Sequence, residues 1–492
     1  MGVIKRQGLK FSLVNYLGVA LGAISSIFIY PRDKELYGLF GFLLDTANIF
    51  VPFALMGTTS ISIQFFPMFA DDKKGHNGFL FWLLALCTFG SILLMLLLWI
   101  FQVPIYQYYA TKSSQLYIQY IYAIVPITIF YVFIIVLKQY CSNFHRIVIP
   151  GLLDQLIKFT FPLLFVLFIS GTISMDYVIY GIIFNYVLYL IGMIWYVRSL
   201  KQFFVKPNFS FLDKSMLDQI IPYAAYGMIG SAGSIMALRI DTFMVGSLTN
   251  LFDTGVYKIA SLIAFNIAVP YAAINSIASP IISKAWKDNN MAEIDKIYKK
   301  SSINLLSFGL ICFIGIWFCI DDLFRIMPKG NEMLGAKYVV IIIAATKLFD
   351  LATGVNDIIT GYSHHYRFNF WSVMTLAVLN IVGNLILIPQ YGILGAAYAI
   401  MISSLTYNLV KYFYIKIYIG MTPFTIHTIK LLGIGLVCVF IGYLIPSFSN
   451  VYVSIVTKAM VLSISYGIML YKFNISDDVS NMVKPLLKKI GL

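Results

Sequence analysis

The chain has 492 residues, of which 60% are hydrophobic and only 11% charged, and it carries a formal net charge of +14. A soluble domain is nearer half apolar and a quarter charged. A water-soluble fold could not bury this much Leu, Ile, Phe and Tyr. The composition therefore excludes a soluble protein and predicts a polytopic membrane protein.

Apolar runs of about 20 residues recur along the whole chain, which is the length that a helix needs to cross a bilayer. They predict an all-α protein with about 14 transmembrane helices joined by short connections. The predicted spans cover residues 10–30, 37–62, 78–101, 116–138, 148–170, 177–198, 219–248, 255–282, 303–320, 337–361, 368–388, 392–415, 429–447 and 451–472.

The basic residues predict the orientation. With Met1 in the cytoplasm, the inside segments carry about 24 Lys and Arg residues and the outside segments about 7. Both termini are therefore expected in the cytoplasm. This bias and the anionic lipid headgroups explain the positive charge, so we expect membrane lipids and no nucleic acid as partners. The first apolar run lacks a small-residue cleavage pattern, and we expect no cleaved signal peptide.

A short motif occurs twice. Residues 48–54 read NIFVPFA and residues 266–272 read NIAVPYA. The alternative to a repeat is chance similarity in a biased composition. A true repeat would place two copies six spans apart and parallel in the membrane, which is typical of transporters with two lobes around a central site.

This repeat predicts the domain organisation and two hinges. Proline removes a backbone hydrogen bond, so the motif is expected to kink matching helices. The hinge candidates are Asn48, Pro52, Asn266 and Pro270. The predicted parts are an N-lobe at 1–214, a C-lobe at 215–418, two further spans at 419–475 and a cytoplasmic tail at 476–492.

Ionisable residues within the spans are the candidate functional residues, because each costs roughly 3 kcal/mol or more at mid-depth in lipid. The candidates for substrate or cavity contact are Asp45, Lys158, Arg239, Asp241, Lys347, Asp350 and Asp357.

Four positions of the tenth span share one face. On a continuous helix Lys347, Asp350, Gly354 and Asp357 lie within an arc of roughly 80°, which predicts a stripe facing a water-filled cavity. The alternative is a Lys347–Asp350 pair extended toward the outer membrane surface, which leaves Asp357 too deep to share it.

The other charges differ in geometry. Asp154 and Lys158 are four residues apart, a spacing that predicts an ion pair within the fifth span.

Arg239 and Asp241 are two residues apart, so they point to opposite faces of a helix and cannot pair with each other. One is expected to face a central cavity, and the other to find a partner on a neighbouring helix or at the outer interface. Lys458 is expected to extend to the membrane surface.

The sequence contains no motif of soluble-enzyme chemistry: no GxxxxGK[ST] loop, no HExxH, no paired Cys-x-x-Cys and no GxSxG elbow. The five cysteines are scattered and lack metal-ligand spacing. We expect no enzyme, no metal and no cofactor. Without an ATP site, transport would draw on an H⁺ or Na⁺ gradient, the membrane potential or downhill substrate flow.

Three segments resemble one family. Arg239-Ile-Asp241, followed by Gly246, Gly255-Val-Tyr257 and Ala260, resembles the R-x-D…G…G-x-Y-x-x-A pattern of bacterial polysaccharide exporters. The segment NIVGNLILIPQYGILGAAYAIMIS and the loop FPMFADDKKGHNGFLF resemble them as well. The family is the polysaccharide-transporter branch, with its O-antigen and lipid-linked oligosaccharide flippases, of the multidrug/oligosaccharidyl-lipid/polysaccharide (MOP) exporter superfamily.

The resemblance implies two six-helix lobes around a central cavity plus two C-terminal helices, in a monomer of the bacterial inner membrane. It implies flipping of an undecaprenyl-diphosphate-linked oligosaccharide by ATP-independent alternating access, for O-antigen (lipopolysaccharide), capsule or exopolysaccharide biosynthesis. Polymerases and glycosyltransferases of the same pathway are the implied partners. Arg239, Lys158 and Lys347 are the cations expected nearest the diphosphate. The repeat offset maps Arg239 onto Leu21, so the first lobe lacks that cation.

Two alternatives stay open. A drug/cation antiporter of the same superfamily would need acidic residues in the first lobe, and Asp45 meets that requirement. A membrane scaffold or a glycan polymerase belongs to another class. A polymerase should have a long polar outside loop, and the longest predicted one, roughly residues 321–336, is too short.

Overall fold

The computed structural model describes residues 18, 20–111, 114–446 and 448–475. It has two compact units, Met1–Gly255 and Val256–Leu492. Both are helical, and the described residues contain no strand, which confirms the all-α prediction. The predicted cytoplasmic tail, 476–492, lies outside the described residues.

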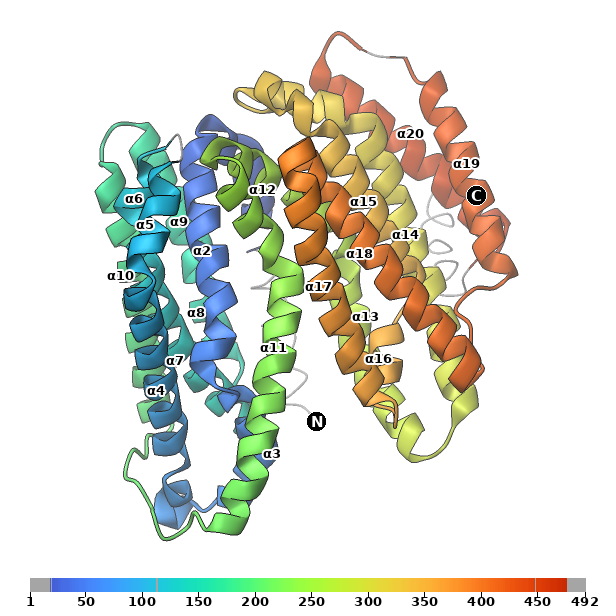
Figure 1. Cartoon of the computed structure of the whole chain (residues 1–492). Coiled ribbons are helices and arrows are strands. Elements are labelled where there is room, and N and C mark those ends of the chain that lie inside the picture. The colour runs from blue at the N-terminus through green and yellow to red at the C-terminus, as the bar shows by residue number, and fades with distance from the viewer. Residues whose placement is uncertain (1–17, 19, 112–113, 447, 476–492) are drawn as a thin grey trace. The chain divides into compact units, whose positions relative to one another are not determined.

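The first unit is built around the long helices α2 and α11, which run side by side (Figure 1). Helices α3 and α7 pack against this pair, α4 packs against α2 and α7, and α10 packs against α7 and α9. Its elements are η1 (Tyr30–Arg32), α2 (Lys34–Leu55), α3 (Thr58–Phe69), η2 (Asp72–Gly78), α4 (Phe79–Ile100), α5 (Gln102–Ala110), α6 (Leu116–Tyr120), η3 (Ile121–Ala123), α7 (Ile124–Asn143), α8 (Val148–Asp154), α9 (Leu156–Ile169), α10 (Met175–Ser199) and α11 (Lys214–Leu248). Helix α12 (Leu251–Phe265) contains the boundary between the units.

In the second unit α17 and α18 form a closely packed antiparallel hairpin, α18 packs on α15, and α14 packs on α13, α15, α19 and α20 (Figure 1). Its elements are η4 (Asn266–Ala268), α13 (Val269–Lys287), α14 (Met291–Ile326), η5 (Gly330–Ala336), α15 (Lys337–Ala352), α16 (Asn356–Gly361), α17 (Tyr366–Tyr391), α18 (Ile393–Tyr414), η6 (Ile415–Ile419), α19 (Ile426–Leu444) and α20 (Val451–Lys472).

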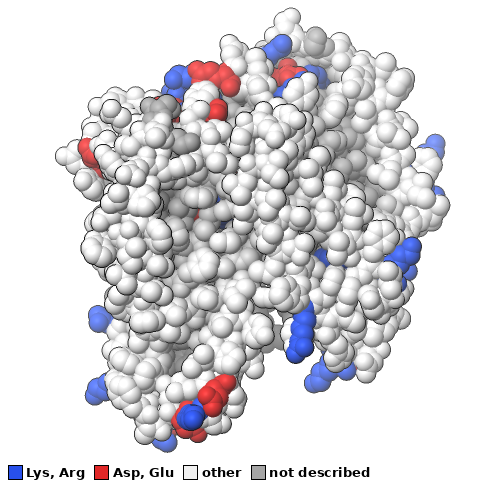
Figure 2. All heavy atoms as spheres, viewed as in Figure 1, with Lys and Arg blue, Asp and Glu red and all other residues white. Residues whose placement is uncertain are grey.

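Within the described residues, 12 helices are long and apolar enough to cross a membrane. The predicted span 10–30 lies partly outside those residues, and the span predicted at 337–361 is divided into α15 and α16. With these two, the count agrees roughly with the 14 predicted. In the first unit, the face shown in Figure 2 carries its charged side chains mainly near the helix ends and is mostly white between them, as expected for a membrane-spanning surface.

The two copies of the repeated motif share a local geometry. Asn48 Nδ2 donates to the Leu44 carbonyl at 2.7 Å, and Asn266 Nδ2 donates to the Leu262 carbonyl at 2.9 Å. In each copy the α-helix is interrupted near the proline. Helix α2 ends three residues after Pro52, and Pro270 lies in the first turn of α13, after the short helix η4.

The two C-terminal helices are packed onto α14 through a buried apolar cluster. It includes Leu306, Leu310 and Ile314 from α14, Ile434 from α19 and Leu462 from α20. At one end of this contact, Lys458 Nζ lies 2.6 Å from Asp322 Oδ2; the Asp322 side chain is buried and that of Lys458 is mostly covered. The expectation that Lys458 extends to the membrane surface is therefore wrong, because α14 provides a carboxylate within reach.

Candidate functional site

One ion pair of the first unit lies deep in its helical core. Arg239 Nη1 on α11 lies 3.1 Å from Asp45 Oδ1 on α2. Asp45 is near the middle of the 22-residue helix α2, far from both ends. Its side chain is 4% exposed, whereas that of Arg239 is 50% exposed. The guanidinium of Arg239 is therefore accessible, and the buried carboxylate of Asp45 holds it in position.

Asp241 lies on the other side of α11 and is buried. This agrees with the expectation that the two charges point to opposite faces, and it identifies Arg239 as the accessible one. Asp45 and Arg239 are separate candidates in the sequence, and the structure brings them together.

Tyrosines hold the end of α11 that follows Arg239. The last carbonyl groups of a helix have no partner within the helix. Here Tyr117 Oη donates to the Gly246 carbonyl, and Tyr108 Oη donates to the Ser247 carbonyl at 2.8 Å. Tyr109 Oη lies 2.7 Å from Ser247 Oγ. These bonds fix the helix end and so the position of the arginine two turns before it.

The glycines of the family-like pattern after Arg239 are packing positions. A Cβ at Gly246 would lie 2.6 Å from the Phe42 ring, and one at Gly255 would lie 1.9 Å from the Lys34 carbonyl oxygen. Real Cβ atoms do not approach so closely, so only glycine fits without movement. This part of the pattern stabilises the helix contacts and does not contribute side chains to a site.

A second polar centre lies in the other unit, on α15 and α18. Lys347 Nζ contacts Asp350 Oδ2 at 2.7 Å. The other carboxylate oxygen, Oδ1, accepts hydrogen bonds from Ser404 Oγ and, at 2.6 Å, from Asn408 Nδ2. The Lys347–Asp350 pair considered from the sequence thus exists, and α18 holds it in place.

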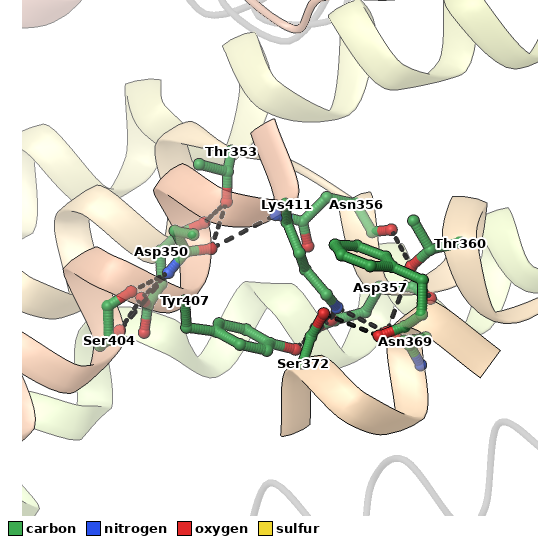
Figure 3. A network of polar contacts seen from close by, with 12 residues as sticks. Asp350, Thr353, Asn356, Asp357, Thr360, Asn369, Ser372, Ser404, Tyr407 and Lys411 are labelled. Atoms are coloured by element: carbon green, nitrogen blue, oxygen red, sulfur yellow. Dashed lines mark hydrogen bonds and ion pairs between the residues drawn. The ribbon is translucent and has the colours of Figure 1, made fainter. Parts of the chain in front are cut away.

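A third centre surrounds Asp357 (Figure 3). Lys411 Nζ on α18 forms an ion pair with Asp357 Oδ1 and donates to Asn369 Oδ1 at 2.6 Å. Tyr407 Oη donates to the same Asp357 oxygen at 2.6 Å. The Lys411 side chain is 0% exposed, while that of Asp357 is 44% exposed.

The prediction of one continuous helix over residues 337–361 is wrong. Helix α15 ends at Ala352, Gly354 has a φ of +63°, and α16 begins at Asn356. The predicted arc of Lys347, Asp350 and Asp357 therefore does not describe one helical face. Instead Asn408 Oδ1 accepts from Thr353 Oγ1 at 3.0 Å and from Asn356 Nδ2 at 3.3 Å, which ties the chain around the break to α18.

The site residues on α18 were not predicted from the sequence. Ser404, Tyr407, Asn408 and Lys411 recur at three- and four-residue intervals, which places them on one face of a helix. That spacing was the available signal. Lys411 was not considered because it lies close to the end of its predicted span.

The prediction of an ion pair between Asp154 and Lys158 is also wrong. Asp154 Oδ2 is 2.9 Å from Lys138 Nζ on α7, and Asp154 Oδ1 accepts a bond from Tyr189 on α10. Helix α8 ends at Asp154 and α9 begins at Leu156, so the regular i,i+4 geometry is interrupted between the two residues. Lys158 is exposed on α9.

These centres can supply cations, carboxylates, hydroxyls and amides within membrane-embedded helices. Among the described residues no group of three or more His, Cys, Asp or Glu side chains could hold a metal ion. The arrangement therefore supports binding of a polar or charged substrate through hydrogen bonds and ion pairs.

Residues 20–286 match the model of a family described as "Polysaccharide biosynthesis protein" (Polysacc_synt), which is more than half of the chain. The chain belongs to this family. Among its relatives, the "Probable low-salt glycan biosynthesis flippase Agl15" of Haloferax volcanii is 23% identical over 48% of this chain and 48% of its own length. The "Capsular polysaccharide biosynthesis protein CapF" of Staphylococcus aureus is 30% identical over 34% of this chain and 42% of its own length. The chain thus spans about half the length of the curated relatives it matches.

Solved structures extend the similarity of the fold to nearly the whole chain. A structure of "Lipid II flippase MurJ, inward closed conformation" has a TM-score of 0.76 at 15% identity and covers 94% of this chain and 98% of its own. An inward-facing "multidrug resistance MATE family transporter of the MOP superfamily" has a TM-score of 0.64 at 12% identity, over 82% of this chain and 94% of its own. The chain therefore has the fold of these two transporters, as the sequence resemblance implies.

Proposed function

We propose that this protein moves an undecaprenyl-diphosphate-linked oligosaccharide across a bacterial inner membrane, as a step in O-antigen, capsule or exopolysaccharide biosynthesis. The observation that carries the proposal is the accessible guanidinium of Arg239 in the middle of a membrane-embedded helical core. A charge in this position is expensive unless it serves a pathway or a partner. Family membership and the name of the relative Agl15 support a glycan substrate and a flippase activity.

The chemistry of arginine suits a diphosphate. A guanidinium presents five N–H donors in a planar fork, which binds phosphate oxygens in pairs. Asp45 engages Nη1, and the half-exposed side chain has further donors for an anionic ligand. Of the other cations expected near the diphosphate, Lys347 is held by Asp350 and Lys158 is exposed on α9. We therefore assign the first contact with the diphosphate to Arg239.

Transport follows ATP-independent alternating access in this proposal, driven by an H⁺ or Na⁺ gradient, the membrane potential or the downhill flow of substrate. The paired helix interruptions at Asn48/Pro52 and Asn266/Pro270 are the proposed hinges, since both copies combine a proline with the same asparagine–carbonyl bond. The lobes at 1–214 and 215–418, the cytoplasmic termini and a monomeric state are parts of the same proposal.

Replacing Arg239 by Ala tests the transport role. In a strain deleted for the gene, the Arg239→Ala variant should reach the membrane at normal levels and fail to restore surface glycan. Arg198→Ala is a matched control because Arg198 is an exposed arginine at the end of α10. Normal surface glycan with Arg239→Ala as the only copy would refute the proposal.

A drug/cation antiporter is the second candidate, favoured by the exposed carboxylate of Asp357 and by the MATE-like fold. Such a transporter would lower the accumulation of ethidium in a drug-sensitive host, and Asp357→Asn would abolish that effect. Loss of surface glycan on deletion, without a change in ethidium accumulation, would exclude it.

A further inference from the structure

The Asp357 centre combines a partly exposed carboxylate with a lysine, Lys411, whose donors are all used within the centre. The ammonium group of Lys411 carries three protons. It has three acceptors around it: Asp357 Oδ1, Asn369 Oδ1 at 2.6 Å and Tyr407 Oη at 2.7 Å. Because the lysine is also fully buried, it has no donor to offer to an anionic ligand.

The two oxygens of the Asp357 carboxylate differ. Oδ1 accepts from both Lys411 and Tyr407, whereas Oδ2 accepts, from the part of the chain that the structure describes, only the long, 3.5 Å bond from Tyr271 Oη. A carboxylate oxygen has room for about two hydrogen bonds. Oδ2 therefore retains acceptor capacity, and the 44% exposure of the side chain makes it accessible.

The exposed side of the Asp357 carboxylate must contact water or a polar ligand and not lipid. A carboxylate in contact with hydrocarbon costs several kcal/mol. Around it lie the hydroxyl group of Tyr407 and the side-chain amide of Asn369 (Figure 3). The hydroxyl group of Tyr271 lies 3.5 Å from Asp357 Oδ2. Tyrosine also provides an apolar ring beside a polar tip, a combination that suits the C–H and O–H faces of a sugar ring.

We propose that the Asp357 face binds hydroxyl groups of an uncharged sugar in the transported glycan and disfavours a sugar that carries a carboxylate. Sugar hydroxyls donate to Oδ2 in a charge-assisted hydrogen bond. A sugar carboxylate would place a second negative charge against Asp357, and Lys411, the cation paired with Asp357 among the described residues, is buried behind it. This inference rests on the proposed function and names the class of sugar that the second unit accepts.

The test is equilibrium binding to the full chain in lipid nanodiscs, with three radiolabelled probes. These are undecaprenyl diphosphate alone, the same lipid with a neutral disaccharide, and the same lipid whose terminal hexose is oxidised to a hexuronic acid. The wild-type protein should prefer the neutral disaccharide over the acidic one by roughly tenfold or more, the size expected for one charge-assisted hydrogen bond. In Asp357→Asn the ratio should approach one, with unchanged binding of undecaprenyl diphosphate.

Two further variants serve as controls. Asp357→Asn combined with Lys411→Met removes both charges and so avoids leaving a buried lysine without a carboxylate; it should abolish the preference as well. Asp321→Asn removes an exposed carboxylate that pairs with Lys337 elsewhere in the same unit, and it should leave the preference intact.

Equal affinity of the wild-type protein for both disaccharides would overturn the inference, as would a preference that survives in Asp357→Asn. Either result leaves the proposed function standing if undecaprenyl diphosphate binds. Failure of all three lipids to bind would instead remove the proposed function itself.

Discussion

Arg239 on α11 and Asp45 on α2 are 194 residues apart in the chain, yet their side chains form a hydrogen-bonded ion pair of 3.1 Å. The exposures of the two groups are very unequal, since the carboxylate is buried and the guanidinium is half exposed. Asp45 therefore fixes the position of Arg239 and compensates part of its charge. The accessible part of the pair remains cationic.

Exchanging the two charges separates the structural role from the transport role. Asp45→Ala and Arg239→Ala should each lower the free energy of unfolding by about 1–2 kcal/mol, the range of a partly exposed charged hydrogen bond. The exchange Asp45→Arg with Arg239→Asp should recover part of that stability, because an ion pair forms again. It should not recover transport, because the cation then lies at the buried position. Thermal unfolding in detergent and surface glycan measure the two effects.

If the exchanged protein restores surface glycan to the wild-type level, the pair is purely structural and Arg239 is not a substrate contact.

The Lys347–Asp350 pair should behave differently from a simple exposed pair. In Lys347→Asp with Asp350→Lys, the ammonium would face the Ser404 hydroxyl and the Asn408 amide, both of which now donate to the carboxylate. We expect the double exchange to recover only part of the stability that Asp350→Lys loses, because the ion pair forms again but the bonds from Ser404 and Asn408 to the carboxylate do not. Thermal unfolding of the two single variants and the double variant would measure this, and full recovery in the double variant would contradict it.

The helices and the charged positions in them could be predicted because both are local properties of the sequence. An apolar run of about 20 residues predicts a span wherever it occurs, and an acid or base within it is visible at once. Asp45, Arg239, Lys347, Asp350 and Asp357 were found in this way. The family-like pattern around Arg239 was also recognisable, although two of its glycines proved to be packing positions.

The partners of these charges could not be predicted, because they come from distant helices. Asp357 and Lys411 are 54 residues apart, and Asp154 pairs with Lys138 in place of the nearer Lys158. The break between α15 and α16 has a local signal in Gly354, but its meaning depends on the bonds from Asn408 that support it. Sequence spacing therefore predicted faces of helices and failed where a helix was interrupted.

Substituting Gly38 tests a close helix contact in the first unit. A Cβ at Gly38 would lie 1.8 Å from the Leu251 carbonyl oxygen, so Gly38→Ala must push the backbones apart. Overpacking of this kind typically costs about 1–3 kcal/mol. We expect a clear decrease in melting temperature in detergent. Gly315→Ala on α14 is the control, because a Cβ there would meet no atom within 4 Å; equal effects of the two changes would contradict the observed contact.

The buried Asp322–Lys458 pair predicts how α20 is held to α14. Ser454 Oγ donates to the same Asp322 oxygen at 2.8 Å, so the carboxylate is engaged twice from α20. Without Lys458, the buried Asp322 carboxylate keeps the longer, 3.7 Å contact with the exposed Arg325. Removing one partner of a buried pair costs up to about 3–5 kcal/mol, whereas an apolar replacement of both is often nearly neutral. Lys458→Met should therefore destabilise the protein more than Asp322→Leu combined with Lys458→Met. Thermal unfolding and protease cleavage near residues 445–450 would report the loosening of α20. A double variant that is less stable than Lys458→Met would show that the pair itself stabilises the contact between the two helices.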